Sequence, residues 1–138
     1  MRDLGIYMHI PFCKRKCAYC DFISFSNKTE LIEKYILALE KEIDKCNINK
    51  DNYIIKTIYF GGGTPSFIES KYIVEILNNI KKKFNISEEV EITIEINPGT
   101  VTEEKLKDYY NAGINRISFG LQSTRSELLK LVGRIHSY

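Results

Sequence analysis

The chain has 138 residues, of which 43% are hydrophobic and 28% charged, a composition typical of one soluble globular domain. Its 20 Lys and Arg residues nearly balance its 18 Asp and Glu residues, for a net charge of +2, and both signs are spread along the chain, so we expect no basic face for nucleic acid. No apolar run reaches the roughly 20 residues that cross a bilayer, and His9 and Pro11 interrupt the best candidate for an export signal. We expect a cytoplasmic protein without a membrane span, and peripheral contact with a membrane stays open.

Four segments have the apolar character of β-strands. They are residues 5–10, 54–60, 90–96 and 116–121. Pro11 ends the first, the triple glycine at 61–63 ends the second, and the run 97–99 ends the third. The third segment also alternates strictly between apolar and polar residues, which is the pattern of a strand.

Between these segments, apolar residues recur at helical spacing. The expected helices cover residues 31–43, 73–84, 102–112 and 123–132. The residues expected at their starts are Asn27 with Glu30, Ser66 with Glu69, Thr102 and Ser123, and those that end the last two are Gly113 and Gly133. Strand and helix alternate four times, which predicts parallel strands joined by helical crossovers in a single α/β domain.

Three of the four cysteines, Cys13, Cys17 and Cys20, fall within one short segment, whereas Cys46 stands alone and is interpreted as structural. A reducing cytosol disfavours disulfides, so thiols this close indicate a metal site or redox chemistry. A redox pair of Cys17 and Cys20 would leave Cys13 unexplained. Zinc would take His9 as its fourth ligand. A cubane iron–sulfur cluster held by three thiolates would keep one iron open for a small molecule.

The other unusual residues also follow predicted strands. The triple glycine follows the second strand, Glu95 lies near the end of the third, and Gln122 and Ser123 follow the fourth. In parallel α/β folds, side chains that meet ligands gather beyond the carboxyl ends of the strands. We therefore expect thiols, a glycine-lined wall, a carboxylate and an amide in one site, where a metal and an organic ligand could bind together.

The spacing C-x3-C-x2-C, with Tyr19 before the last cysteine and a strand before the first, resembles that of the radical S-adenosylmethionine (SAM) superfamily. Within it, YMHIPFC at residues 7–13 and GGGTPS at residues 61–66 resemble the branch that contains oxygen-independent coproporphyrinogen III oxidase and a haem chaperone. The resemblance covers essentially the whole chain. It implies a partial parallel (β/α) barrel with about four β-α units present, and residues 1–138 as the N-terminal part of a radical SAM core domain.

The resemblance also implies the ligands of this site. Cys13, Cys17 and Cys20 would hold a [4Fe-4S] cluster, and its fourth iron would bind the amino and carboxylate groups of SAM. An unidentified electron donor would supply the electron that cleaves the sulfonium. The implied contacts of SAM are Tyr7, Tyr19 near the adenine, Gly62, Gly63 and Thr64 at the methionine part, Glu95 at the ribose, Gln122 and Arg134.

Two features favour the chaperone over the oxidase. The oxidase carries a further cysteine two residues after the third cluster cysteine, where this chain has Asp21-Phe22. The string GRIHS at residues 133–137 looks more like the haem-chaperone relatives. We expect a haem chaperone-like protein that binds [4Fe-4S], SAM and haem. Oxidative decarboxylation of a porphyrinogen and a zinc-stabilised binding module remain the alternatives, so enzymatic activity stays open.

Overall fold

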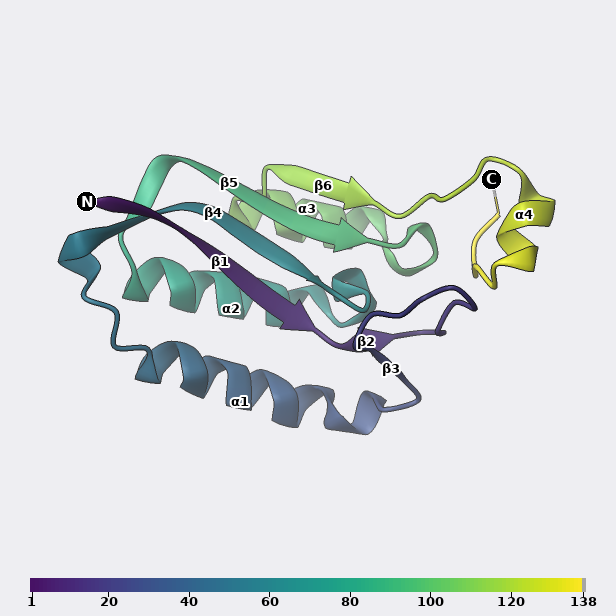
Figure 1. Cartoon of the computed structure of the whole chain (residues 1–138), viewed down its shortest axis with the longest axis horizontal. Coiled ribbons are helices and arrows are strands. Elements are labelled where there is room, and N and C mark those ends of the chain that lie inside the picture. Colours follow the sequence, from purple (N-terminus) through teal and green to yellow (C-terminus); the bar gives the residue numbers. More distant parts are fainter. Residues whose placement is uncertain (138) are drawn as a thin grey trace.

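The predicted strands form one parallel sheet in the computed structural model, which describes residues 1–137. The strands are β1 (Arg2–Ile10), β4 (Tyr53–Gly62), β5 (Ile86–Ile96) and β6 (Arg116–Phe119). They lie in the order β1-β4-β5-β6, so the sheet grows in one direction along the chain. Because all pairs are parallel, the carboxyl ends of the strands meet at one edge of the sheet (Figure 1).

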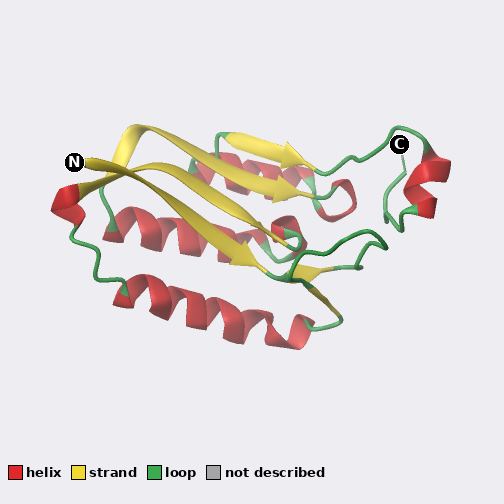
Figure 2. Cartoon of the chain, in the orientation of Figure 1, coloured by secondary structure: helices red, strands yellow, loops and turns green. Residues whose placement is uncertain are grey.

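Three helices cover one face of this sheet. They are α1 (Ile32–Lys45), α2 (Ser70–Lys83) and α3 (Glu103–Ala112), and Figure 2 shows them on the same side of the strands. Between the layers lies a core made largely of isoleucine, in which Ile58, Ile73 and Ile94 are fully buried. Within residues 1–137 no helix covers the opposite face, which would be the interior of a closed barrel. The predicted partial parallel (β/α) barrel is confirmed.

Cys17 and Cys20 lie in a loop that is fixed at both of its ends, and Cys13 lies at its start. Short strands β2 (Phe12–Cys13) and β3 (Phe25–Ser26) pair with each other on either side of it. The amide of Phe25 also donates to the carbonyl of Pro11 at 2.7 Å. The loop therefore leaves and returns at the carboxyl end of β1.

The predicted starts of the first two helices are wrong, and a tertiary contact explains one of them. Asn27 has a left-handed backbone (φ 62°), and α1 begins only at Ile32, without a side-chain cap. Ser66 lies in a 3-10 turn at Pro65–Phe67, and α2 begins at Ser70. The Ser66 hydroxyl instead bonds the Thr100 hydroxyl at 2.7 Å, so it ties two loops together and does not cap a helix.

The last two helices differ in how well their ends were predicted. The Thr102 hydroxyl accepts from the Lys105 amide at 3.3 Å, and Gly113 ends α3 with φ 96°, so both predicted ends of α3 are confirmed. α4 (Ser126–Leu131) is only six residues long and has no side-chain cap, so the predicted Ser123 cap is wrong. The Ser123 hydroxyl accepts from the Arg125 amide instead, at 3.0 Å. α4 lies beyond the carboxyl ends of the strands and not over the sheet (Figure 1).

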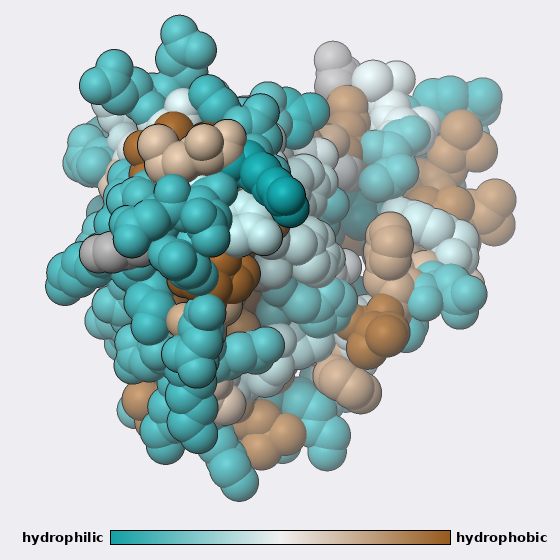
Figure 3. All heavy atoms as spheres, turned by 60° about the vertical axis from the view of Figure 1, so that its left-hand side comes forward, coloured by the Kyte–Doolittle hydropathy of each residue, from teal (hydrophilic) through white to brown (hydrophobic). Residues whose placement is uncertain are grey.

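The end of the molecule where the strands begin has a mainly hydrophilic surface, with hydrophobic residues in smaller groups (Figure 3). No helix found within residues 1–137 has both the length and the apolar character needed to cross a membrane. The unusual residues all belong to the other end, where the strands finish.

Candidate functional site

A cavity of about 270 Å³ lies at the carboxyl ends of the strands. It brings together ten of the residues predicted from the sequence, from the cysteine loop, the ends of β4 and β5, and the segment after β6. These are Cys13, Cys17, Cys20, Tyr19, Gly62, Gly63, Thr64, Glu95, Gln122 and Arg134. Tyr7 is not among the lining residues. It lies on β1 with 57% of its surface exposed, and its ring stacks on that of Tyr59.

Glycine allows the chain at the end of β4 to approach Cys13 closely. A Cβ added to Gly63 would lie 2.9 Å from Cys13 Sγ and 2.9 Å from the Phe12 carbonyl oxygen, closer than real Cβ atoms approach. The Thr64 hydroxyl donates to Cys13 Sγ at 3.5 Å. The backbone at residues 62–64 therefore forms a wall of the cavity directly against the thiol. Within this wall, Gly62 has a φ of 117°, a backbone conformation that favours glycine.

Arg134 closes the cavity from the C-terminal side. Its Nη1 donates to Cys17 Sγ at 3.7 Å, and its Nη2 donates to the carbonyl of Gly120. Among the described residues its Nε is buried without a hydrogen-bond partner. A guanidinium so placed can stabilise negative charge on sulfur, and its unpaired N–H is available to an acceptor on a ligand.

Two further residues at the cavity carry signs of a specialised environment. Gln122 has a left-handed backbone (φ 67°), a conformation that non-glycine residues adopt mostly where surrounding structure imposes it. Burial raises the pKa of Tyr19, the nearby Cys17 raises it further, and Arg134 opposes the rise. Tyr19 is thus influenced by both a thiol and a cation.

The lining also contains residues that the sequence did not single out. They include Asn97, Ser118 and Gly120, which follow or end strands. Their position at strand ends was the signal that could have found them. Arg15 and Lys16 also line the cavity, and their place between Cys13 and Cys17 in the sequence predicts cations that offset part of the negative charge of the thiolates.

The donor set fits an iron–sulfur cluster better than a single metal ion. All four cysteines are free, and three of them line the cavity. Within residues 1–137, no three His, Cys, Asp or Glu side chains converge closely enough to hold one ion between them. A single zinc needs its ligands at about 2.3 Å from one point, whereas the thiolates of a cubane bind different iron atoms. The soft thiol donors and the adjacent cations suit a negatively charged cluster.

His9 is committed to other partners. Its Nε2 lies 2.9 Å from the Ile23 carbonyl oxygen, which can only accept, so Nε2 carries the proton. Nδ1 then accepts from the Tyr7 hydroxyl at 3.2 Å. With both ring nitrogens engaged, His9 ties the cysteine loop to β1, which removes the ligand on which the zinc alternative depended.

Comparison with known proteins agrees with this geometry. The sequence is 43% identical over 136 residues to the haem chaperone HemW of Buchnera aphidicola, covering 97% of this chain and 36% of that protein. It is 41% identical to HemW of Escherichia coli, covering 96% of this chain and 35% of the relative. The chain therefore spans about a third of the length of these curated relatives.

Solved structures share the fold. The coproporphyrinogen III oxidase HemN of Escherichia coli, described as a radical SAM enzyme, superposes with a TM-score of 0.88 at 28% identity, over 99% of this chain and 32% of that one. Elp3 of Methanocaldococcus infernus, at 19% identity and a TM-score of 0.52, shares the fold alone. Residues 7–138 match the radical SAM superfamily. The chain belongs to the radical SAM superfamily.

Proposed function

We propose that this chain is part of a haem chaperone-like protein that binds a [4Fe-4S] cluster, SAM and haem. The observation that carries the proposal is the shared cavity, in which three free thiols face a glycine wall, a carboxylate and an arginine. We place residues 1–138 in the N-terminal part of a longer radical SAM core domain. The exposed Ile117 and Phe119 on edge strand β6 support this, because apolar side chains at a sheet edge are normally covered.

Cys13, Cys17 and Cys20 would hold the cluster, since thiolates are its usual protein ligands. When bound, the cluster supplies one-electron reduction of the SAM sulfonium. Arg134 donates to Cys17 sulfur and would stabilise the negative charge there. The exposed cations of the cysteine loop, Lys14, Arg15 and Lys16, would add to this effect.

The remaining lining residues would bind and orient SAM. The close main chain at Gly62, Gly63 and Thr64 would hold the methionine part, because backbone groups can bond it without an intervening side chain. Glu95 can accept both ribose hydroxyl hydrogens. Tyr19 would lie beside the adenine, and Gln122 would contact SAM from the segment after β6. Tyr7, whose ring stacks on that of Tyr59, would contact SAM from β1.

Haem as the cargo is favoured by the 41–43% identity to the HemW relatives, against 28% to HemN. A cytoplasmic location and a separate electron donor belong to the same proposal. An oxidase would instead convert coproporphyrinogen III to protoporphyrinogen IX. The two functions differ in turnover. An oxidase consumes SAM as it decarboxylates its substrate, whereas a chaperone binds haem without this reaction.

Anaerobic reconstitution of the chain tests the proposal. We expect about four irons and four sulfides per chain, as a [4Fe-4S] cluster requires, and a changed electron paramagnetic resonance signal of the reduced cluster when SAM is added. Titration with haem is expected to give a saturable absorbance change. Bound zinc without sulfide, or a reduced cluster that does not respond to SAM, would contradict the cofactor assignment. Sustained protoporphyrinogen IX formation would favour the oxidase.

A further inference from the structure

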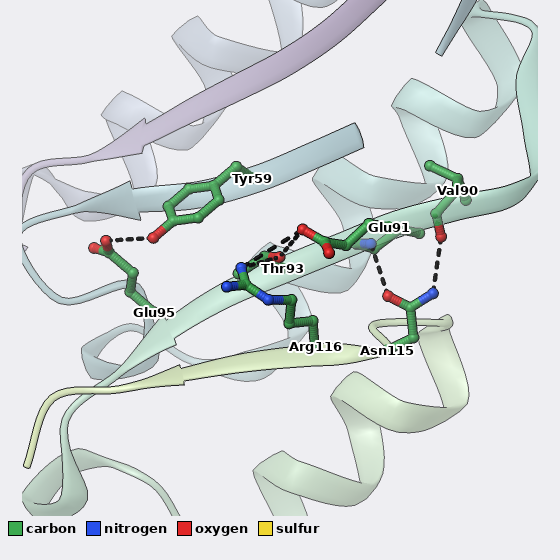
Figure 4. Close-up of polar contacts among 8 residues, drawn as sticks. Tyr59, Val90, Glu91, Thr93, Glu95, Asn115 and Arg116 are labelled. Atoms are coloured by element: carbon green, nitrogen blue, oxygen red, sulfur yellow. Dashed lines mark hydrogen bonds and ion pairs between the residues drawn. The ribbon is translucent and has the colours of Figure 1, made fainter. Parts of the chain in front are cut away.

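A tyrosine that the sequence did not single out holds the acid of the candidate SAM site. The hydroxyl of Tyr59 on β4 donates to Glu95 Oε1 on β5 at 2.7 Å. Figure 4 shows the two side chains pointing toward each other across the helix-free face of the sheet. Among residues 1–137 this is the one hydrogen bond of the Glu95 side chain, so Oε2 is left for a ligand.

The Tyr59 ring is itself held in place. It stacks on Tyr7, its register partner on β1, with ring centroids 6.0 Å apart and an interplanar angle of 22°. Both rings lie against Gly61, where an added Cβ would come within 2.9 Å of Tyr59 and 3.1 Å of Tyr7. The ring packs on Tyr7, and the absence of a side chain at Gly61 leaves room for it. The Tyr59 hydroxyl therefore has a defined position.

The tyrosine holds Glu95 without neutralising it. Arg116, a cation on the same face, pairs with Glu91 at 3.5 Å and donates to Thr93 Oγ1 at 3.2 Å (Figure 4). Burial raises the pKa of Tyr59, and the bond to Glu95 raises it further, so the hydroxyl stays protonated as a donor at neutral pH. The tyrosine therefore holds the Glu95 side chain through a neutral hydroxyl and places no charge of its own beside it.

We propose that Tyr59 is a positioning residue for Glu95, fixing one carboxylate oxygen so that the other faces the ribose diol of SAM. The inference rests on the proposed function, because it takes SAM as the ligand. A carboxylate already fixed in its bound rotamer loses less conformational entropy when the ligand arrives. The hydroxyl of Tyr59 thus acts on SAM only through Glu95.

A double-mutant cycle on the reconstituted chain tests this, with SAM binding measured by equilibrium dialysis of labelled SAM. The variants are Tyr59→Phe, Glu95→Ala and their combination, with Tyr110→Phe, an exposed tyrosine on α3, as the control. We expect Tyr59→Phe to weaken SAM binding about tenfold, the change that about 1.4 kcal/mol makes. In the Glu95→Ala background the same substitution is expected to have no further effect, and the control to bind normally.

Each other outcome is decisive. Equal losses from Tyr59→Phe in both backgrounds, or unchanged affinity in the Tyr59→Phe variant, would overturn the proposal while leaving the proposed function standing. Loss of iron from Tyr59→Phe would also overturn it, because the residue would then act on the cluster and not through Glu95. If the unsubstituted chain assembles its cluster but binds no SAM, the proposed function fails and this inference fails with it.

Discussion

The face of the sheet under the helices and the cavity at its carboxyl ends are built in opposite ways. Under the helices, side chains such as Ile58, Ile73 and Ile94 are 0% exposed and pack on one another. At the cavity, the thiols are free, glycine replaces side chains, and the Arg134 Nε is buried without a partner among residues 1–137. The first region is stabilised by buried apolar surface, whereas the second keeps hydrogen-bond donors and acceptors that a ligand can pair with.

Replacing one thiol is expected to have the largest effect, and only on the cavity. Cys17→Ala removes one of the three thiolates, so we expect loss of nearly all bound iron and sulfide after reconstitution, measured by chemical analysis. Cys46→Ala is the matched control, because Cys46 follows α1 at the other end of the molecule. Both variants are expected to keep the circular dichroism of the original chain. Iron retained by Cys17→Ala would show that the ligands are different ones.

A core substitution is expected to affect the stability of the fold and not the cavity. Ile94→Ala truncates a fully buried side chain on β5, and we expect it to lower the free energy of unfolding by about 2–5 kcal/mol in urea titrations of the cluster-free chain. The control is its register partner Ile117 on β6, which is 44% exposed. Ile117→Ala is expected to cost about 1 kcal/mol or less, because little apolar area is lost. Equal costs would mean that the helix-covered face does not carry the stability.

Crowding the glycine wall is expected to have a smaller effect, concentrated on ligand binding. Gly63→Ala forces a shift of Cys13 or the Phe12 carbonyl, each 2.9 Å from the new Cβ, and we expect SAM affinity to fall about tenfold. Gly5→Ala is a matched control, because its Cβ would meet the Thr57 hydroxyl at 2.7 Å far from the cavity. It is expected to lower stability but not SAM affinity, as measured by thermal unfolding and dialysis. Unchanged binding by Gly63→Ala would indicate that the residues form only a turn.

The same contrast explains what the sequence could predict. The strands and helices follow from short-range apolar periodicity, and the Thr102 cap and the Gly113 end of α3 follow from neighbouring residues alone. Ser66 has an equally good capping pattern, but its hydroxyl is taken by Thr100, 34 residues away. No local pattern reports such a partner.

Site residues were predictable as a set but not as contacts. Parallel strands place their ends together, so the cysteine loop, the glycine run and Glu95 could be assigned to one edge from sequence alone. The bond from Arg134 to Cys17 spans 117 residues, and the bond from Tyr59 to Glu95 depends on strand register. Such pairings arise from the packing of the whole fold, which periodicity does not encode.

The smallest predicted effect concerns a buried polar group in the core under the helices. Tyr109 on α3 is 1% exposed, and within residues 1–137 its hydroxyl is buried without a hydrogen-bond partner. Burial raises the pKa of Tyr109, so the hydroxyl stays neutral and its desolvation is uncompensated. Tyr109→Phe is expected to raise the free energy of unfolding by up to about 1 kcal/mol in urea, whereas the exposed neighbour Tyr110→Phe should change nothing. A loss of stability would show instead that the hydroxyl bonds a buried water, and that even this region keeps one polar group for an outside partner.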